Sequence, residues 1–131
     1  MAGKLTFELV SPERLVMSVE VDRVTVPGTE GDFGVMAGHA PFMTTLRPGV
    51  VDVEDGREET RLFVRGGFAE VNAAGLTLLA EHALPLAELD AAALEREIGN
   101  AEEDVADAQT DAARTRAEMR LNHLKQLRDA L

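Results

Sequence analysis

The 131-residue chain contains no cysteine, no tryptophan and no tyrosine. Without cysteine it has no disulfide framework, no thiolate nucleophile and no sulfur metal ligand, which suits the cytosol. Its aromatic residues are five phenylalanines, so the core has to be built mainly from Val, Leu, Ala and Met. Basic residues are also scarce, since 13 Lys and Arg oppose 24 Asp and Glu for a net charge of −11. Direct binding to nucleic acid or to an anionic membrane is therefore not expected.

Long apolar runs are missing as well. No stretch approaches the roughly 20 apolar residues of a membrane-spanning helix, and the first residues lack the apolar run of a signal peptide. We therefore expect membrane association to come through a partner. The lack of a transit segment favours a bacterial source.

The first 85 residues alternate apolar and polar side chains, as strands do. Odd-numbered positions are apolar in the segments 5–9 and 15–21. Val24 and Val26 continue the pattern on even numbers, which predicts a bulge or bend at Asp22-Arg23 because a one-residue shift turns the apolar side chains to the other face.

Turn signals divide the remainder of this region. Asp55-Gly56 predicts a two-residue type I′ hairpin turn, Gly66-Gly67 predicts a kink between two strands, and residues 72–75 predict a further turn. Short strands at this spacing predict an N-terminal β-sandwich of about 8–10 strands over residues 1–85.

Beyond this region the apolar period becomes that of a helix. One apolar stripe covers residues 86–105 and a second covers residues 113–131. Glu88 or Asp90 lies near the start of the first helix, where a carboxylate offsets the helix dipole, and Thr110 or Asp111 is the predicted N-cap of the second.

Residues 86–131 are therefore predicted to form a C-terminal antiparallel two-helix hairpin, a candidate regulatory domain. A single continuous helix stays open, because residues 104–110 contain neither Gly nor Pro. Much of the seam is alanine, whose burial stabilises less than that of leucine, so we expect the tail to undock and rearrange.

The densest cluster of turn residues is 27–42, with four glycines, two prolines and His39. No Gly-Lys pair follows the glycines, and their spacing does not match the dinucleotide fingerprint. The three histidines are far apart, and no serine lies in a Gly-x-Ser-x-Gly elbow, so we expect neither a metal site nor a catalytic residue. In one interpretation the glycines supply turn conformations, Pro27 and Pro41 end strands, and His39 hydrogen-bonds within the turn. In the interpretation that we favour, the stretch is an ordered loop that another protein recognises.

Four motifs, in this order and spacing, carry a resemblance that covers essentially the whole chain. They are Val26–Gly34, Gly38–Pro41, Leu46–Gly49 and Gly66–Glu70. Together they resemble the epsilon subunit of bacterial F-type ATP synthases. The resemblance implies a non-catalytic central-stalk subunit of the rotor, without a cofactor, on the cytoplasmic face of the inner membrane. Such a subunit helps to couple proton flow to ATP synthesis.

The resemblance also implies partners. In this family the sandwich binds the gamma subunit and touches the c-ring, and the glycine-rich turn lies toward the ring. The expected contact residues are Glu30, Gly31, Asp32 and His39. The alternative to a stalk subunit is a free-standing β-sandwich binding module with an accessory helical tail.

Family members can use the helical tail as a brake on ATP hydrolysis, by extending it toward an acidic segment of the beta subunit. The last helix of this chain is rich in basic residues that suit such a contact. These candidates are Arg114, Arg116, Arg120, Lys125 and Arg128. They equally fit pairing with acids of the preceding helix or exposure to solvent, where each pair contributes about 0–1 kcal/mol.

Some bacterial relatives bind ATP through the motif Ile/Leu-Asp-x-x-Arg-Ala in this tail. Here Asp90 remains, but Ala93 replaces the arginine. The loss of a guanidinium removes charge and hydrogen-bond donors that a phosphate needs, so we expect no nucleotide binding.

Overall fold

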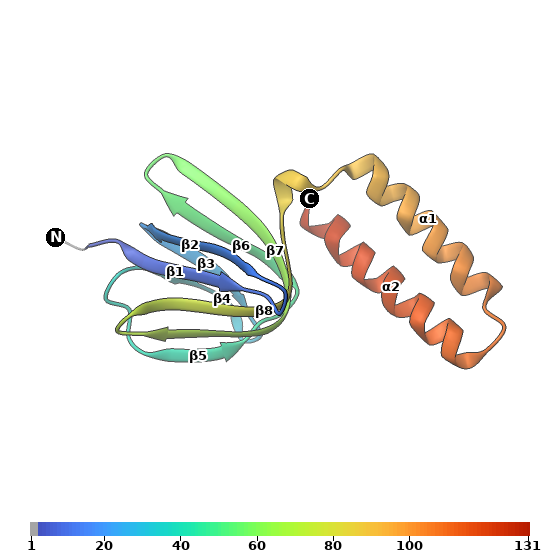
Figure 1. Cartoon of the computed structure of the whole chain (residues 1–131), viewed down its shortest axis with the longest axis horizontal. Coiled ribbons are helices and arrows are strands. Elements are labelled where there is room, and N and C mark those ends of the chain that lie inside the picture. The colour runs from blue at the N-terminus through green and yellow to red at the C-terminus, as the bar shows by residue number, and fades with distance from the viewer. Residues whose placement is uncertain (1–2) are drawn as a thin grey trace. The chain divides into compact units, whose positions relative to one another are not determined.

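The computed structural model describes residues 3–131, which divide into two compact units. The first unit ends at Ala87, and the second spans Glu88–Leu131. Figure 1 shows strands in the first unit and two helices in the second. No helix within residues 3–131 is both long and apolar enough to cross a membrane.

The first unit is a β-sandwich with eight strands in the described residues, which confirms the predicted fold (Figure 1). The strands are β1 (Leu5–Val10), β2 (Leu15–Val21), β3 (Arg23–Gly28), β4 (Gly31–Val35), β5 (Phe42–Thr45), β6 (Gly49–Asp55), β7 (Glu58–Asn72) and β8 (Gly75–Pro85). Their order is β2-β1-β8-β7-β6-β3-β4, and β5 pairs with β7. The β1–β8 pair is parallel and the other pairs are antiparallel.

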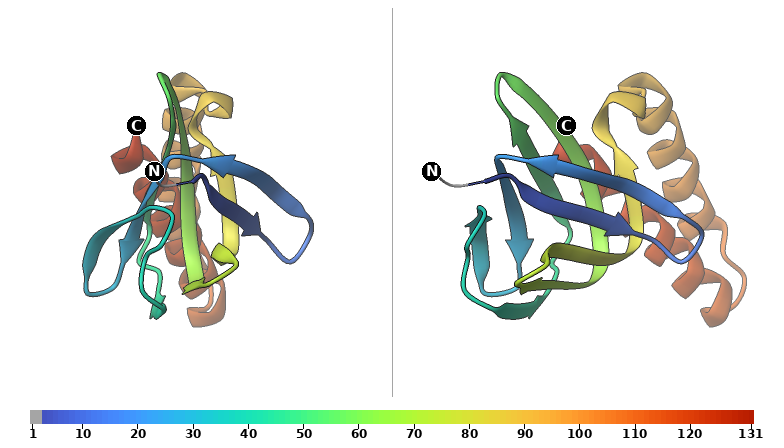
Figure 2. Two further views of the ribbon diagram at one scale, coloured as in Figure 1. Left: turned by 90° about the vertical axis from the view of Figure 1, so that its left-hand side faces the viewer. Right: turned by 60° about the vertical axis from the view of Figure 1, so that its left-hand side comes forward.

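Strand β7 connects the two layers of the sandwich (Figure 2). Its first half pairs with β6 and its second half, Phe68–Val71, pairs with β5. Between the halves lie Gly66 and Gly67, with φ angles of 72° and 99°. The predicted kink is confirmed, but the backbone remains one 15-residue strand through it. The expected division into two strands is therefore wrong.

The core between the layers is largely aliphatic, as composition predicted. Leu5, Phe7 and Leu9 of β1 are all buried. In β2 the predicted inward face is only partly realised, because Val21 is buried whereas Leu15 is 57% exposed. The register of the β1–β2 ladder shifts after Leu9, so Leu15 pairs with Val10 and leaves the inward face.

The predicted bend at Asp22-Arg23 is confirmed, because β2 ends just before it and Val24 and Val26 of β3 are fully buried. The hairpin turn between β6 and β7 needs a correction. Asp55 pairs with Glu58, so the two turn residues are Gly56-Arg57 and not Asp55-Gly56.

Positive φ in this turn occurs at Gly56, at 63°, and not at Arg57. That pattern fits a type II′ turn, which needs positive φ at its first central residue alone, and not the predicted type I′. The expectation that Pro27 ends a strand is also wrong. Pro27 lies inside β3 opposite Asp32, and its carbonyl accepts a 3.0 Å hydrogen bond from the Arg47 N–H.

A short 3-10 turn, η1 (Leu86–Glu88), spans the boundary between the units, and the second unit contains α1 (Ala91–Asp107) and α2 (Asp111–Ala130). The helices lie side by side as an antiparallel hairpin, which confirms that prediction over one continuous helix (Figures 1 and 2). Helix α1 begins later than its apolar stripe suggested, because the Asp90 carboxylate caps it. That carboxylate accepts from the N–H groups of Ala92 and Ala93 at 3.0 and 3.2 Å.

The buried seam between α1 and α2 is mostly leucine and isoleucine, so the expectation that much of it is alanine is wrong. Its buried residues are Leu94, Ile98, Ala101, Leu124 and Leu127. Leu131 was placed on the apolar stripe, but it is 53% exposed because α2 ends one residue before it. Undocking of this hairpin stays a prediction.

An ionic cluster ties β1 to two turns of the sandwich. The Lys4 ammonium lies 3.0 Å from Asp22 and also donates to Asp55, and the Gly56 N–H donates to Asp22 at 2.6 Å. The Gly56 hydrogen bond and the Lys4 contact lower the pKa of Asp22. Hydrogen bonds to Asp55 and Asp22 raise the pKa of Lys4.

We expect Gly67→Ala to destabilise the sandwich by about 3 kcal/mol or more. A Cβ at this position would lie 1.7 Å from the Leu79 carbonyl oxygen, and φ is +99°. Urea unfolding measures the change. Gly34→Ala is the control, because the nearest atoms are the far end of the long Arg23 side chain and not backbone, and it should cost less than about 1 kcal/mol. Equal stability of the two variants would contradict this account of the kink.

Asp22→Asn should lower the melting temperature at neutral pH. Because folding lowers the pKa of Asp22, its stabilisation is complete above the usual value of 3.8 and is lost as the pH falls through the folded value. The difference in melting temperature between wild type and variant should therefore disappear in acid, and added salt should reduce it at neutral pH. Glu13→Gln, in the exposed turn after β1, is the control. A gap that stays constant down to pH 2 would refute the role of the carboxylate.

Candidate functional site

The glycine-rich stretch 27–42 is a hairpin and a turn, not one loop. Strand β3 ends at Gly28, Thr29 and Glu30 form the turn, and β4 follows directly. We call residues 29–32 the hairpin tip. Residues 36–41 then lead into β5.

The hairpin tip is exposed and held in place by polar contacts. Thr29 and Thr45 bond through a backbone N–H and carbonyl at 3.0 Å and through their hydroxyl groups at 2.9 Å. The Asp32 carboxylate accepts from the Arg47 guanidinium. A Cβ on Gly28 would lie 2.9 Å from the Gly31 carbonyl oxygen, so glycine permits the close approach of the two strands. The tip thus presents acidic groups on an ordered backbone.

His39 lies in the second turn, where its predicted hydrogen bonding is confirmed. Its backbone N–H donates to the Met36 carbonyl at 3.2 Å, and its ring Nδ1 lies 2.7 Å from the Ala40 carbonyl oxygen. This turn and the β7–β8 turn, residues 72–75, line a shared cavity of about 160 Å³.

The structure does not bring His39 together with Glu30, Gly31 and Asp32. The hairpin tip follows the bridge between Gly28 and Leu46, beside the β7 kink, whereas His39 lies near the β7–β8 turn. The single loop assumed from sequence is therefore wrong, because residues 31–35 form a strand that separates its ends.

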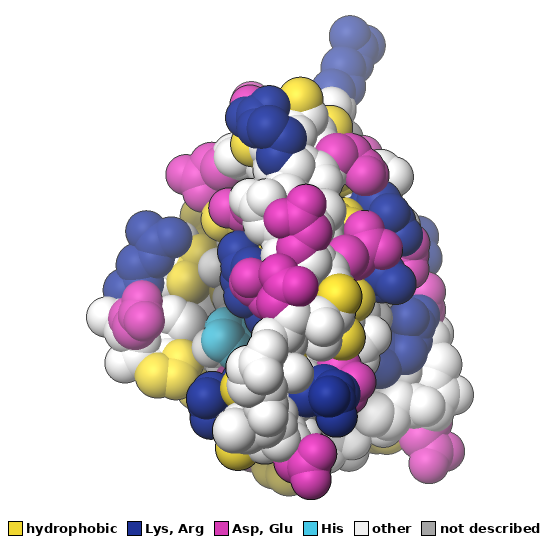
Figure 3. Space-filling view, turned by 90° about the vertical axis from the view of Figure 1, so that its right-hand side faces the viewer, with side chains coloured by type: hydrophobic (Ala, Val, Ile, Leu, Met, Phe, Trp, Pro, Cys, Tyr) yellow, Lys and Arg dark blue, Asp and Glu magenta, His cyan; other side chains and the backbone are white. Residues whose placement is uncertain are grey.

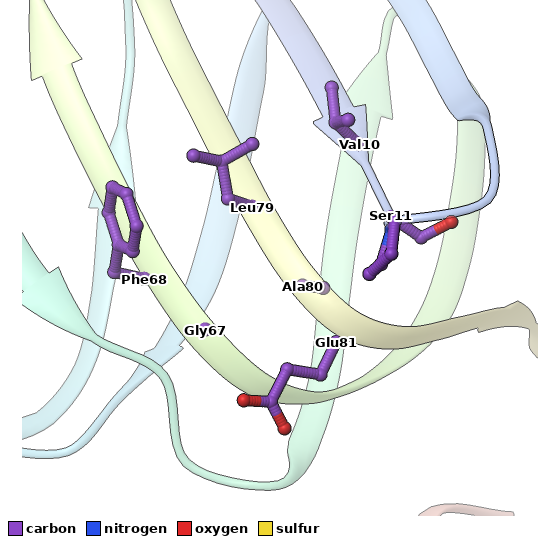
Figure 4. A pocket seen from close by; sticks show the side chains of 8 residues that line it. Val10, Ser11, Gly67, Phe68, Leu79, Ala80 and Glu81 are labelled. Carbon is purple, nitrogen blue, oxygen red and sulfur yellow. The ribbon is translucent and has the colours of Figure 1, made fainter.

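An apolar row on the outer face of the sandwich was not among the residues predicted from sequence. It comprises Leu15, Val10, Leu79 and Phe68, which are register partners across β2, β1, β8 and β7. Figure 4 shows part of this row around a cavity of about 380 Å³, with Ser11 and Glu81 beside it. Apolar residues at two consecutive positions, Leu78 and Leu79, are the sequence signal, because alternation places one of them outside.

The five basic residues of α2 divide into two groups. Arg120 and Arg128 lie 3.8 Å from Asp104 and Glu95 of α1, and Arg114 lies 3.5 Å from Asp111 of its own helix. Arg116 and Lys125 form no ion pair with any residue from 3 to 131.

Acidic and basic side chains alternate over the face shown in Figure 3. The paired interpretation thus holds for part of the predicted set. These exposed pairs are weak, so they leave the arginines able to exchange partners.

The remnant of the ATP motif has a structural role in this chain. Asp90 caps α1, and Ala93 supplies one of the N–H groups that it accepts from. A capping carboxylate is already bound to the helix N-terminus, which adds to the argument against nucleotide binding. Among residues 3–131 no group of three His, Asp or Glu side chains could hold a metal ion.

Comparison with known proteins gives concordant results. Residues 4–86 match the family model described as ATP synthase, Delta/Epsilon chain, beta-sandwich domain. The chain is 62% identical over 129 residues to the ATP synthase epsilon chain of Parvibaculum lavamentivorans, covering 98% of both chains. It is 54% identical to the ATP synthase epsilon chain of Maricaulis maris, covering 89% of this chain and 88% of that one.

Two solved assemblies contain a similar fold. A chain of the Euglena gracilis mitochondrial ATP synthase, solved with OSCP, F1 and c-ring, aligns with a TM-score of 0.78 and 27% identity. The alignment covers 99% of this chain and 82% of that chain. A chain of the Tetrahymena thermophila central stalk and c-ring aligns with a TM-score of 0.64 over 98% of this chain and 97% of that chain. Its 18% identity supports the fold alone. On its sequence and its fold, the chain belongs to the ATP synthase delta/epsilon chain family.

Proposed function

We propose that the sandwich of this central-stalk subunit docks on the gamma subunit and turns its hairpin tip, Glu30 to Asp32, toward the c-ring. Family membership gives the broader role, that of a non-catalytic rotor subunit of the F-type ATP synthase. The observation that carries the finer assignment is the tip itself, which exposes Glu30 and Asp32 on a backbone fixed by the Thr29–Thr45 and Asp32–Arg47 contacts. An ordered tip loses little conformational entropy on binding.

The tip and His39 need different assignments. Because β4 separates them, a small surface that contacts the tip does not also contact His39. We assign the c-ring contact to Glu30, Gly31 and Asp32. His39 serves first to fix its own turn, and its exposed side can contact another neighbour.

The apolar row supports docking on gamma. Leu15 and Leu79 are 57% and 39% exposed; Val10 lies between them in the row, and Phe68 lies beyond Leu79. Permanent subunit interfaces bury apolar surface of this kind, whereas polar residues suit contacts that change during rotation. The related epsilon chains come from bacteria, so we place this contact on the cytoplasmic face of the inner membrane.

The helical hairpin is the proposed brake on ATP hydrolysis. Arg116 and Lys125 have no acidic partner in the described chain, and the other three arginines form weak exposed pairs. An acidic segment of the beta subunit could therefore attract all five when the hairpin opens.

Cross-linking tests the position of the tip. Because the chain has no cysteine, Glu30→Cys introduces a single reactive thiol. In the assembled ATP synthase this thiol should cross-link to a cysteine placed in the polar loop of the c-ring, detected as a shifted band. His39→Cys is the matched control at the other turn and should not give this product. Cross-linking of His39→Cys alone would reverse our assignment.

Deletion of residues 88–131 tests the brake. The reconstituted complex should then hydrolyse ATP several-fold faster, measured at saturating MgATP, because the restraint is gone. A chain in which the five basic residues of α2 are changed to Gln keeps the full hairpin. It therefore shows whether the charge of α2, or only the presence of the hairpin, restrains hydrolysis. Unchanged hydrolysis in both cases would leave the hairpin with a structural role only.

A further inference from the structure

Strand β2 has an open edge. It pairs with β1, and no other strand of the described chain lies beyond it in the sheet order. Open edges are commonly blocked by proline, by inward-pointing lysine or by a bulge within the strand. The sequence of β2, LVMSVEV, contains no proline and no lysine, and the single register shift of its ladder falls at Val16, near its start. Its edge is therefore free to pair with another strand.

A groove runs beside this edge, between the two layers of the sandwich. It has a volume of about 270 Å³, and its apolar lining comes from Met17, Val19 and Val21 of β2 and from Val53 of β6. Val19 is 39% exposed, although its ladder partner Phe7 is fully buried. The difference arises because no strand covers the outer side of β2. Apolar side chains at the margin of the core, Met17 and Val19, are thus accessible along this line.

The acidic residues that line the groove indicate which kind of partner would bind in it. Glu20, Asp55 and Glu58 line the same groove, and none of its described lining residues is basic. Lys4, the residue before β1, forms an ion pair with Asp55. Glu20 and Glu58 remain without a basic partner in residues 3–131. An occupant with Lys or Arg beside its apolar side chains would match these acids.

We infer that β2 receives an extended segment of a neighbouring ATP synthase subunit as an added strand. Its backbone would pair with the free edge, because only another extended backbone meets a row of N–H and carbonyl groups. Its apolar side chains, two residues apart, would cover Met17 and Val19, and its basic residues would face Glu20 and Glu58. A second copy of this chain is disfavoured, because it would bring the same acids and a charge of −11 to the groove. The inference rests on the proposed place of the chain in the complex.

Hydrogen exchange of the full chain, free and in the assembled ATP synthase, tests strand addition directly. Alternate amides within 15–21 should exchange at least tenfold more slowly in the complex, because added pairing protects every second N–H on the free edge. Incorporation of the chain with unchanged exchange in β2 would overturn the inference and leave the proposed function standing. Failure of the chain to enter the complex would overturn the proposed function.

A pair of variants tests the groove. Val19→Lys places a charge where the apolar contact is proposed and should weaken binding to the complex that lacks this chain about tenfold or more. Ser18→Lys adds the same charge on the opposite face of the strand, next to Glu20 and away from the apolar contact, and should weaken binding less than Val19→Lys does. Melting temperatures of both variants exclude unfolding as the cause.

Two results would contradict the groove contact. One is equal affinity of Val19→Lys and wild type for the complex. The other is concentration-dependent self-association of the free chain that Val19→Lys abolishes, because the edge would then pair with a second copy.

Discussion

The sandwich depends on one close backbone approach, between Gly67 of β7 and the Leu79 carbonyl of β8. A side chain at residue 67 would overlap that oxygen, and the positive φ of Gly66 and Gly67 lets β7 bend there. The bend allows one strand to pair with β6 in its first half and β5 in its second. Both layers, and the core between them, follow from this connection.

The surfaces of the sandwich are chemically distinct. The hairpin tip is acidic and fixed by Arg47, the row through Val10 and Leu79 on the outer face is apolar, and the groove beside β2 combines an apolar lining with carboxylates. A small domain can therefore contact several neighbours at once without one surface serving for two contacts. This arrangement suits a non-catalytic subunit of a rotary complex, which binds its neighbouring subunits and transmits rotation between them.

The helical unit is stabilised differently. Its seam buries five side chains, one of them alanine, and its ion pairs are exposed and 3.5–3.8 Å long. Capping by Asp90 and Thr110 stabilises each helix separately rather than their contact. Each helix is thus stabilised more strongly than the contact between the two helices. This difference is the physical basis for proposing that the tail changes its arrangement.

The sequence alone determined the two-part architecture, the bend at Asp22-Arg23 and the kink at Gly66-Gly67, because periodicity and glycine placement act locally. It did not reveal that β4 separates His39 from Asp32, since only pairing with β3 makes a strand of residues 31–35. Nor could it find Arg47 beside Asp32, or Val10 beside Leu79, because these residues meet across strands that lie far apart in the chain. Local sequence sets the elements, whereas the order of strands in the sheet decides which side chains share a surface.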